Sequence, residues 1–134
     1  MLTTPCKYTQ TYKQILRDAL STKIDPERMA AMGYLQYMQK FHTFRSDFGP
    51  SSGKSTAAAE VARDVPGVLL VVKSESEAVR LKRQYRIGNV MSRVQYENGH
   101  AGRGAPISLL IFDDCKSKVQ QYGARVVHLG GAEC

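Results

Sequence analysis

The sequence predicts a single α/β domain of three layers, in which helices flank a mostly parallel sheet of about four strands and two N-terminal helices pack on it. Apolar runs rich in β-branched residues alternate with segments of helical spacing, a pattern typical of parallel sheets. A length of 134 residues suits one domain. We therefore assign residues 1–134 to one domain, with a helical N-terminal extension at 1–40 and an α/β core at 41–131.

The first forty residues are expected to form the two N-terminal helices. Apolar residues recur at helical spacing between Tyr8 and Leu20. The second helix is predicted to start at Asp25-Pro26-Glu27, because aspartate caps a helix, proline fits its first turn and glutamate suits the positive end of its dipole. A stripe of methionine, leucine and aromatic side chains then marks one buried face as far as residue 41.

Strands and helices alternate through the rest of the chain. Strands are predicted at 41–45, 68–72, 107–112 and 125–129, and helices at 54–63, 74–85 and 116–122. The run at 68–72 is apolar throughout, as expected for a strand buried on both faces. Ser74 followed by Glu77 has the spacing of a capping box. Residues 86–105 are ambiguous, with a loop expected at 98–104.

The charge balance favours a polyanionic partner. The chain has 19 basic and 12 acidic residues and a net charge of +7, which attracts nucleic acid through its phosphates. A solvated basic surface without such a partner explains the same charge, so both interpretations stay open.

Cysteine usage and hydropathy bear on the compartment. Three widely spaced cysteines, Cys6, Cys115 and Cys134, predict neither a disulfide framework nor a zinc site. No run approaches the roughly 20 apolar residues that span a bilayer, and the first residues lack the apolar core of a secretory signal. We therefore expect no membrane partner and a cytoplasmic location, in the host cytoplasm if the protein is viral.

A candidate phosphate-binding loop, Gly49-Pro50-Ser51-Ser52-Gly53-Lys54-Ser55-Thr56, lies between a predicted strand and a predicted helix. Glycine lets consecutive backbone N–H groups point into one concavity, and the helix start adds its positive dipole end. Lys54 is placed to reach the β- and γ-phosphates, Ser55 to ligate Mg²⁺ and Thr56 to lie near the α-phosphate. We therefore expect ATP and Mg²⁺ as ligands. The other residues expected to line the nucleotide are Gly49, Ser51, Ser52 and Gly53.

Two carboxylates, Asp113 and Asp114, follow the predicted strand at 107–112. The carboxyl ends of parallel strands are where α/β folds place their ligands. A bare carboxylate pair there is unfavourable unless a cation meets it, so we interpret the pair as part of a magnesium site. The alternative is that both aspartates cap the helix predicted at 116–122.

Together these two segments resemble the P-loop NTPases, in the branch with a RecA-like (ASCE) ATPase core. Gly53-Lys54-Ser55-Thr56 looks like the centre of a Walker A motif, and residues 109–114 look like a Walker B strand with a following acid. The resemblance covers residues 41–131. It implies that Asp113 is the magnesium carboxylate and that Asp114 orients the attacking water.

The resemblance also has implications for the strand order. In RecA-like cores the strand after Walker B lies between Walker B and the P-loop strand, and it ends in a polar sensor residue. Here that strand runs into His128, which is therefore the sensor candidate. A packed or surface histidine is the alternative.

Two residues depart from the family pattern. The Walker A spacing places its first glycine at position 48, which is Phe48, and Gly49 stands one place later. Some phage DNA-packaging terminases similarly lack that glycine. Asp114 stands where the family usually has glutamate, whose side chain is one methylene longer. These departures concern the entrance of the loop and hydrolysis, and they do not concern Lys54.

Four basic residues are further candidates. Lys73, after the strand at 68–72, matches a position at which helicase-like proteins touch a nucleic-acid backbone. Arg86 and Arg93 lie near tyrosines, and arginine with interleaved aromatic residues binds phosphate and stacks bases. Arg103 is flanked by glycines and is a candidate arginine finger for a neighbouring subunit, in a homo-oligomer or a larger ATPase assembly. Solvated basic side chains are the alternative for all four.

The sequence therefore predicts an ATP-binding P-loop ATPase module that hydrolyses ATP with Mg²⁺ and acts on or beside nucleic acid. Two alternatives stay open. The first is a nucleotide-dependent interaction or switch module with poor hydrolysis, which the short chain without a second RecA-like lobe favours. The second is a small nucleotide kinase, which is disfavoured because no lid region is evident after the P-loop helix.

Overall fold

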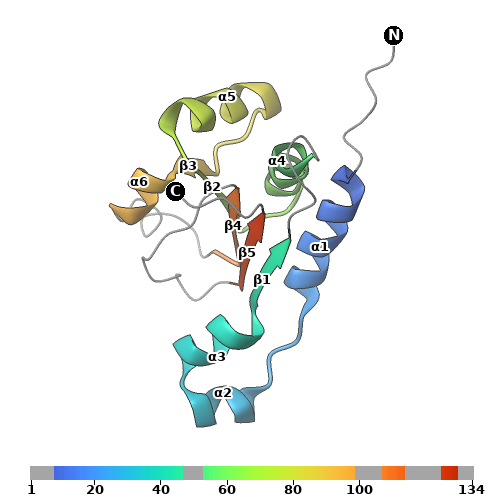
Figure 1. The fold of residues 1–134 in the computed structure, drawn as a ribbon, viewed down its shortest axis with the longest axis vertical. Helices are drawn as coiled ribbons and strands as arrows, with labels where there is room; N and C mark the ends of the chain where they lie inside the picture. The colour runs from blue at the N-terminus through green and yellow to red at the C-terminus, as the bar shows by residue number, and fades with distance from the viewer. Residues whose placement is uncertain (1–7, 47–52, 99–106, 114–124, 130–134) are drawn as a thin grey trace.

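The computed structural model describes residues 8–46, 53–98, 107–113 and 125–129 (Figure 1). Its helices and strands, in chain order, are α1 (Thr9–Ser21), α2 (Pro26–Met32), α3 (Tyr34–Phe41), β1 (Thr43–Ser46), α4 (Lys54–Asp64), β2 (Val68–Val72), α5 (Glu75–Tyr85), β3 (Val90–Ser92), α6 (Arg93–Glu97), β4 (Leu109–Asp113) and β5 (Arg125–Leu129). Among these described helices, none is both long and apolar enough to cross a membrane.

The strands form one sheet in the order β1-β5-β4-β2-β3, and every described pair is parallel. The predicted α/β class and parallel sheet are therefore confirmed, with one strand more than expected. The added strand is β3, which lies in the segment whose sequence is ambiguous. It was not predicted because three residues are too few to establish an alternation. Strand β5 lies between β1 and β4, which is the order that the resemblance implies.

Helices cover the sheet on both faces. Helices α1, α4 and α5 pack on one face (Figure 1), where their apolar side chains form a large buried cluster with strand residues such as Leu70 and Ile111. On the opposite face, Tyr96 of α6 packs with Leu110 and Phe112. Strands β2 and β4 are consequently buried at every position, which explains why their sequences are apolar without a break.

Helix α4 is fixed on three sides. Its alanines at 57–59 and 62 are buried, and such small side chains let α1, α5 and the sheet approach closely. Lys13 of α1 and Glu60 of α4 form an ion pair of 2.5 Å, with side chains 14% and 24% exposed. Helix α4 is therefore held in a defined position relative to the sheet.

The N-terminal extension differs from the prediction in one respect: it contains three helices, because the predicted second helix breaks at Gly33. This glycine has a φ of 89°, which is left-handed backbone that side chains rarely adopt. Asp25 caps α2 as expected, since its carboxylate accepts from the N–H of Glu27 at 3.1 Å. The Tyr37 hydroxyl accepts from the N–H of Asp25 at 2.7 Å, which ties α3 to the start of α2.

The other predicted boundaries agree closely with the structure. The bounds of β2 and β5 are those expected, whereas β1 and β4 start two residues later than predicted and each ends one residue later. Ser74 caps α5 by accepting from the N–H of Glu77 at 3.2 Å. A complete capping box is formed instead at the start of α6, between Ser92 and Gln95. The helix predicted at 116–122 lies outside the described residues.

Candidate functional site

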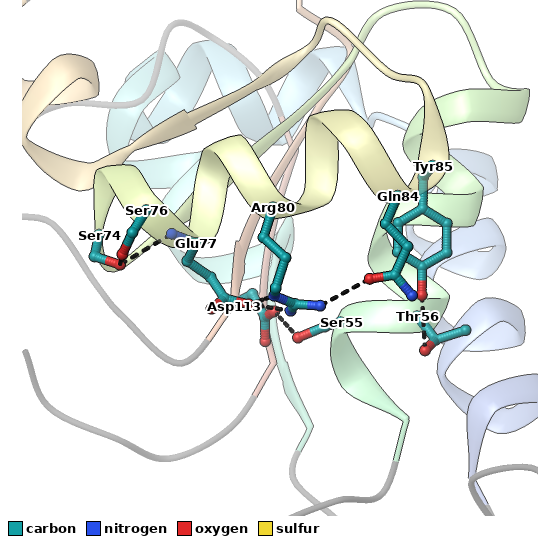
Figure 2. Close-up of polar contacts among 9 residues, drawn as sticks. All are labelled: Ser55, Thr56, Ser74, Ser76, Glu77, Arg80, Gln84, Tyr85 and Asp113. Carbon is teal, nitrogen blue, oxygen red and sulfur yellow. Dashed lines mark hydrogen bonds and ion pairs between the residues drawn. The ribbon is translucent and has the colours of Figure 1, made fainter.

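The carboxyl ends of the strands meet at one edge of the sheet, as parallel strands require. In register, Val72 of β2 lies beside Asp113 of β4 and beside Ser92 of β3. Helix α4 begins at Lys54, and its first turn reaches Asp113 at this edge (Figure 2). The edge therefore brings together the two sequence motifs that were expected to share a site.

The start of α4 has a backbone conformation that is compatible with a bound anion. Gly53 precedes the helix with a φ of 98° and a ψ of 17°, in the left-handed region, and it is buried. A residue with a side chain is strained in this conformation, which explains the glycine before Lys54. In the described part of the chain no side chain caps this end of the helix, and helical carbonyls do not reach its first N–H groups. These groups and the helix dipole favour an anion here.

Ser55 and Asp113 form the central contact of the site (Figure 2). The Ser55 hydroxyl donates a hydrogen bond of 2.6 Å to Oδ2 of Asp113, and Asp113 is only 5% exposed. Both oxygens are hard ligands of the type that Mg²⁺ prefers. Neighbouring ligands of an octahedral Mg²⁺, at about 2.1 Å each, lie roughly 3 Å apart. The pair therefore fits the ion once the two oxygens move slightly further apart.

The described residues contain no group of three or more histidine, cysteine, aspartate and glutamate side chains arranged for a metal. Mg²⁺ does not depend on such a group, because it usually binds one or two carboxylates and completes its shell with substrate phosphates and water. The hydrogen-bonded oxygens of Ser55 and Asp113 would suit a site of this second kind.

Helix α5 adds Arg80, a residue that the sequence did not indicate. Figure 2 shows its side chain on the side of α5 that faces the Ser55–Asp113 pair. The Arg80 guanidinium donates to Glu77 at 3.1 Å and to Gln84 at 2.9 Å. Its pKa is raised, first by the hydrogen bond to Glu77 and to a smaller extent by the negative charge of Asp113. A positive charge therefore lies within electrostatic range of the buried carboxylate.

A second contact joins α5 to the first turn of α4. The Tyr85 hydroxyl donates a hydrogen bond of 3.1 Å to the hydroxyl of Thr56, the residue expected near the α-phosphate (Figure 2). Tyr85 is half-buried and packs against the core cluster. Sequence patterns contain no signal for this pair, because the spacing of residues along one helix does not reveal which residues of another helix they contact.

The sensor candidate His128 lies on the other face of the sheet. Its ring stacks on Phe112 with a centroid separation of 5.1 Å and an interplanar angle of 14°. Phe112 belongs to the core cluster of the α6 face, whereas Ser55 and α4 lie on the opposite face. The structure therefore does not bring His128 together with Ser55 and Asp113, and the sensor role stays a prediction.

The basic candidates divide between the carboxyl ends and the amino ends of the strands. Lys73 follows β2 and Arg93 follows β3, so both lie at the edge that carries Asp113. Lys73 is exposed and Arg93 is half-buried. Arg86 ends α5 with a φ of 56° and precedes β3, so it lies toward the amino ends of the strands. The structure thus groups Lys73 and Arg93 with the site and separates Arg86 from it.

The remaining candidates lie outside the described residues. They are Gly49, Ser51 and Ser52 of the loop, the second acid Asp114, and the finger candidate Arg103. Their roles stay predictions from the sequence.

Comparison with known proteins adds no assignment, since no family model, no curated protein and no solved structure matches the chain. The class of the protein is therefore defined by its fold and site: an α/β protein with a parallel sheet and a serine–aspartate oxygen pair at the carboxyl edge of that sheet.

Proposed function

We propose that this protein is an ATP-binding P-loop ATPase module that uses Mg²⁺ and acts on or beside nucleic acid. The observation that carries the proposal is the 2.6 Å hydrogen bond between Ser55 and Asp113. These residues come from the start of α4 and the end of β4, and they are the two side chains that a P-loop site needs for its magnesium ion.

Each residue of the site has a distinct task in this proposal. The N–H groups that follow Gly53 and the ammonium of Lys54 hold the β- and γ-phosphates. Ser55 and Asp113 would hold Mg²⁺, which would supply positive charge to the phosphates. Thr56 lies toward the α-phosphate, and Asp114 orients the water that attacks the γ-phosphate.

The nucleic-acid part of the proposal rests on charge. The net charge of +7 exceeds what nucleotide binding needs. Lys73 and Arg93 lie at the edge of the sheet that carries Asp113, so a phosphate backbone bound there lies next to the nucleotide.

A nucleotide-dependent switch with poor hydrolysis is the second candidate function. The hydrogen bond between Thr56 and Tyr85 favours it, because it connects the turn that binds phosphate with a different helix. A change at the nucleotide can therefore reach α5, which is what a switch requires.

Titration with a fluorescent ATP analogue, with and without Mg²⁺, tests the proposal. We expect Lys54→Ala to weaken binding about tenfold or more, because a charge-assisted phosphate contact contributes about 1.5–3 kcal/mol. Asp113→Asn should remove most of the effect of Mg²⁺. Lys82→Ala, which removes an exposed charge from α5, is the matched control. Equal affinity in Lys54→Ala and Lys82→Ala would contradict the proposal.

A further inference from the structure

We propose that Arg80 binds the γ-phosphate of the nucleotide, and that Glu77 and Gln84 hold its guanidinium near the Ser55–Asp113 pair until the nucleotide binds. The inference rests on the proposed function, since it names a further residue of the same site. In this inference the arginine that contacts the γ-phosphate comes from the same chain as Lys54.

The position of α5 is the first argument. The helix starts directly after β2, whose last residue, Val72, lies beside Asp113 in register. It then runs past the start of α4, to which Tyr85 is hydrogen-bonded. Arg80 lies between these two points, and its side chain extends toward the Ser55–Asp113 pair (Figure 2). The charge of Asp113 contributes to the raised pKa of Arg80, which agrees with this placement.

The position of the Ser55–Asp113 pair indicates which phosphate Arg80 would contact. In the proposed site, Ser55 and Asp113 would hold a magnesium ion, which would supply positive charge to the β- and γ-phosphates. Lys54 approaches these phosphates from α4. A guanidinium that comes from α5, on the side of Asp113, is therefore nearest to the γ-phosphate. Arginine at this place stabilises the negative charge of the transition state.

The interactions of Arg80 with Glu77 and Gln84 are weak enough for a phosphate to replace them. The side chains of Arg80 and Glu77 are 50% and 33% exposed, and ion pairs at such exposure contribute little. A phosphate offers two oxygens to the planar guanidinium and more negative charge than one carboxylate. Glu77, Arg80 and Gln84 lie on the same helix, so the exchange needs a rotation of the Arg80 side chain and no movement of α5.

The difference between ATP and ADP gives a direct readout, because ADP has no γ-phosphate. We expect Arg80→Ala to weaken Mg-ATP binding about tenfold and to leave Mg-ADP binding within about twofold. Lys82→Ala is the control, since it removes one positive charge on the opposite side of α5. It should leave the ratio of the two Kd values unchanged. Turnover should fall with Arg80→Ala and recover only in part with Arg80→Lys, which lacks the planar fork.

A double-mutant cycle with Glu77 tests whether Glu77 holds the Arg80 guanidinium before the nucleotide binds. Glu77→Gln removes the competing carboxylate, so ATP should bind about two- to threefold more tightly. The same substitution should have no effect on ATP binding when Arg80 is already alanine.

The outcomes separate this inference from the proposed function. If Lys54→Ala abolishes ATP binding while Arg80→Ala behaves as Lys82→Ala does, only the role of Arg80 is refuted. If Arg80→Ala weakens ATP and ADP equally, Arg80 does not read the γ-phosphate and the inference fails. If the parent binds neither nucleotide, both the inference and the proposed function fail.

Discussion

Replacing Ser55 by alanine tests the contact on which the candidate site is built. The hydrogen bond is 2.6 Å long, its acceptor is a carboxylate, and that carboxylate is 5% exposed. Hydrogen bonds to charged groups contribute about 1.5–3 kcal/mol to stability. Alanine favours a helix over serine by about 0.5 kcal/mol, which offsets part of the loss. We therefore expect Ser55→Ala to lower the free energy of unfolding by about 2 kcal/mol.

Urea denaturation followed by circular dichroism, without nucleotide, measures this loss. For a domain of this size, about 2 kcal/mol corresponds to a fall in Tm of roughly 6–10 °C. Ser21→Ala is the matched control, because Ser21 is exposed and its hydroxyl bonds to the carbonyl of Arg17 in its own helix at 3.0 Å. This control should lose less than about 0.5 kcal/mol.

Combining Ser55→Ala with Asp113→Asn isolates the contact itself. Residues in direct contact show coupling energies of about 0.5–3 kcal/mol, whereas independent sites add within about 0.5 kcal/mol. We expect a coupling of about 1 kcal/mol or more for this charge-assisted pair. The reasoning is refuted if the two effects add, or if Ser55→Ala is as stable as Ser21→Ala.

Three further predictions concern other described contacts. Tyr85→Phe removes the donor to Thr56 and should lower stability by about 1 kcal/mol; an unchanged urea midpoint contradicts it. Burial, and secondarily the charge of Arg125, lowers the pKa of His42 below its usual 6.5. The unfolded chain therefore takes up the proton more readily, so stability should fall as pH drops below about 6.5, and urea midpoints at several pH values should show a weaker fall in His42→Gln. Finally, DNA or RNA binding should weaken with salt, and the paired reversals Lys73→Glu and Arg93→Glu should reduce the slope of log K against log salt; equal slopes in parent and variant would count against this edge as the contact surface.

Periodic and apolar patterns predicted most of the fold because they extend over many residues. Strands 68–72 and 125–129 were found with their bounds, and Asp25 and Ser74 were identified as caps. The break at Gly33 was missed because the apolar stripe continues on both sides of it. Burial then differs across the break: α3 buries Tyr37 and Met38, whereas α2 has no buried residue. A pattern of residue types does not distinguish these cases.

The candidate site was predictable as far as it depends on local motifs. Gly53-Lys54-Ser55-Thr56 and Asp113 were identified from their chemistry and from their places at a helix start and a strand end. Arg80 was not, because its relation to the site depends on how α5 lies over α4 and β4. The position of His128 could not be predicted without the strand register. His128 pairs with Phe112, one residue before Asp113. Because side chains alternate between the faces of a sheet, the His128 side chain lies on the face opposite to that of Asp113.

The place of β5 in the sheet has a consequence for how the protein folds. Among the described strands, β1 pairs with β5 alone, from Thr43–Val126 to Ser46–Leu129. The strand that precedes α4 in the sequence is therefore joined to the strand of Asp113 by the last described strand of the chain. Contacts between such distant segments form late, because the entropy of closing a long loop is lost before the contacts contribute favourable free energy. A nascent chain that has not yet presented residues 125–129 has the sequence of both motifs but lacks the strand that connects them, so β1 and β4 cannot yet be held in one sheet through β5.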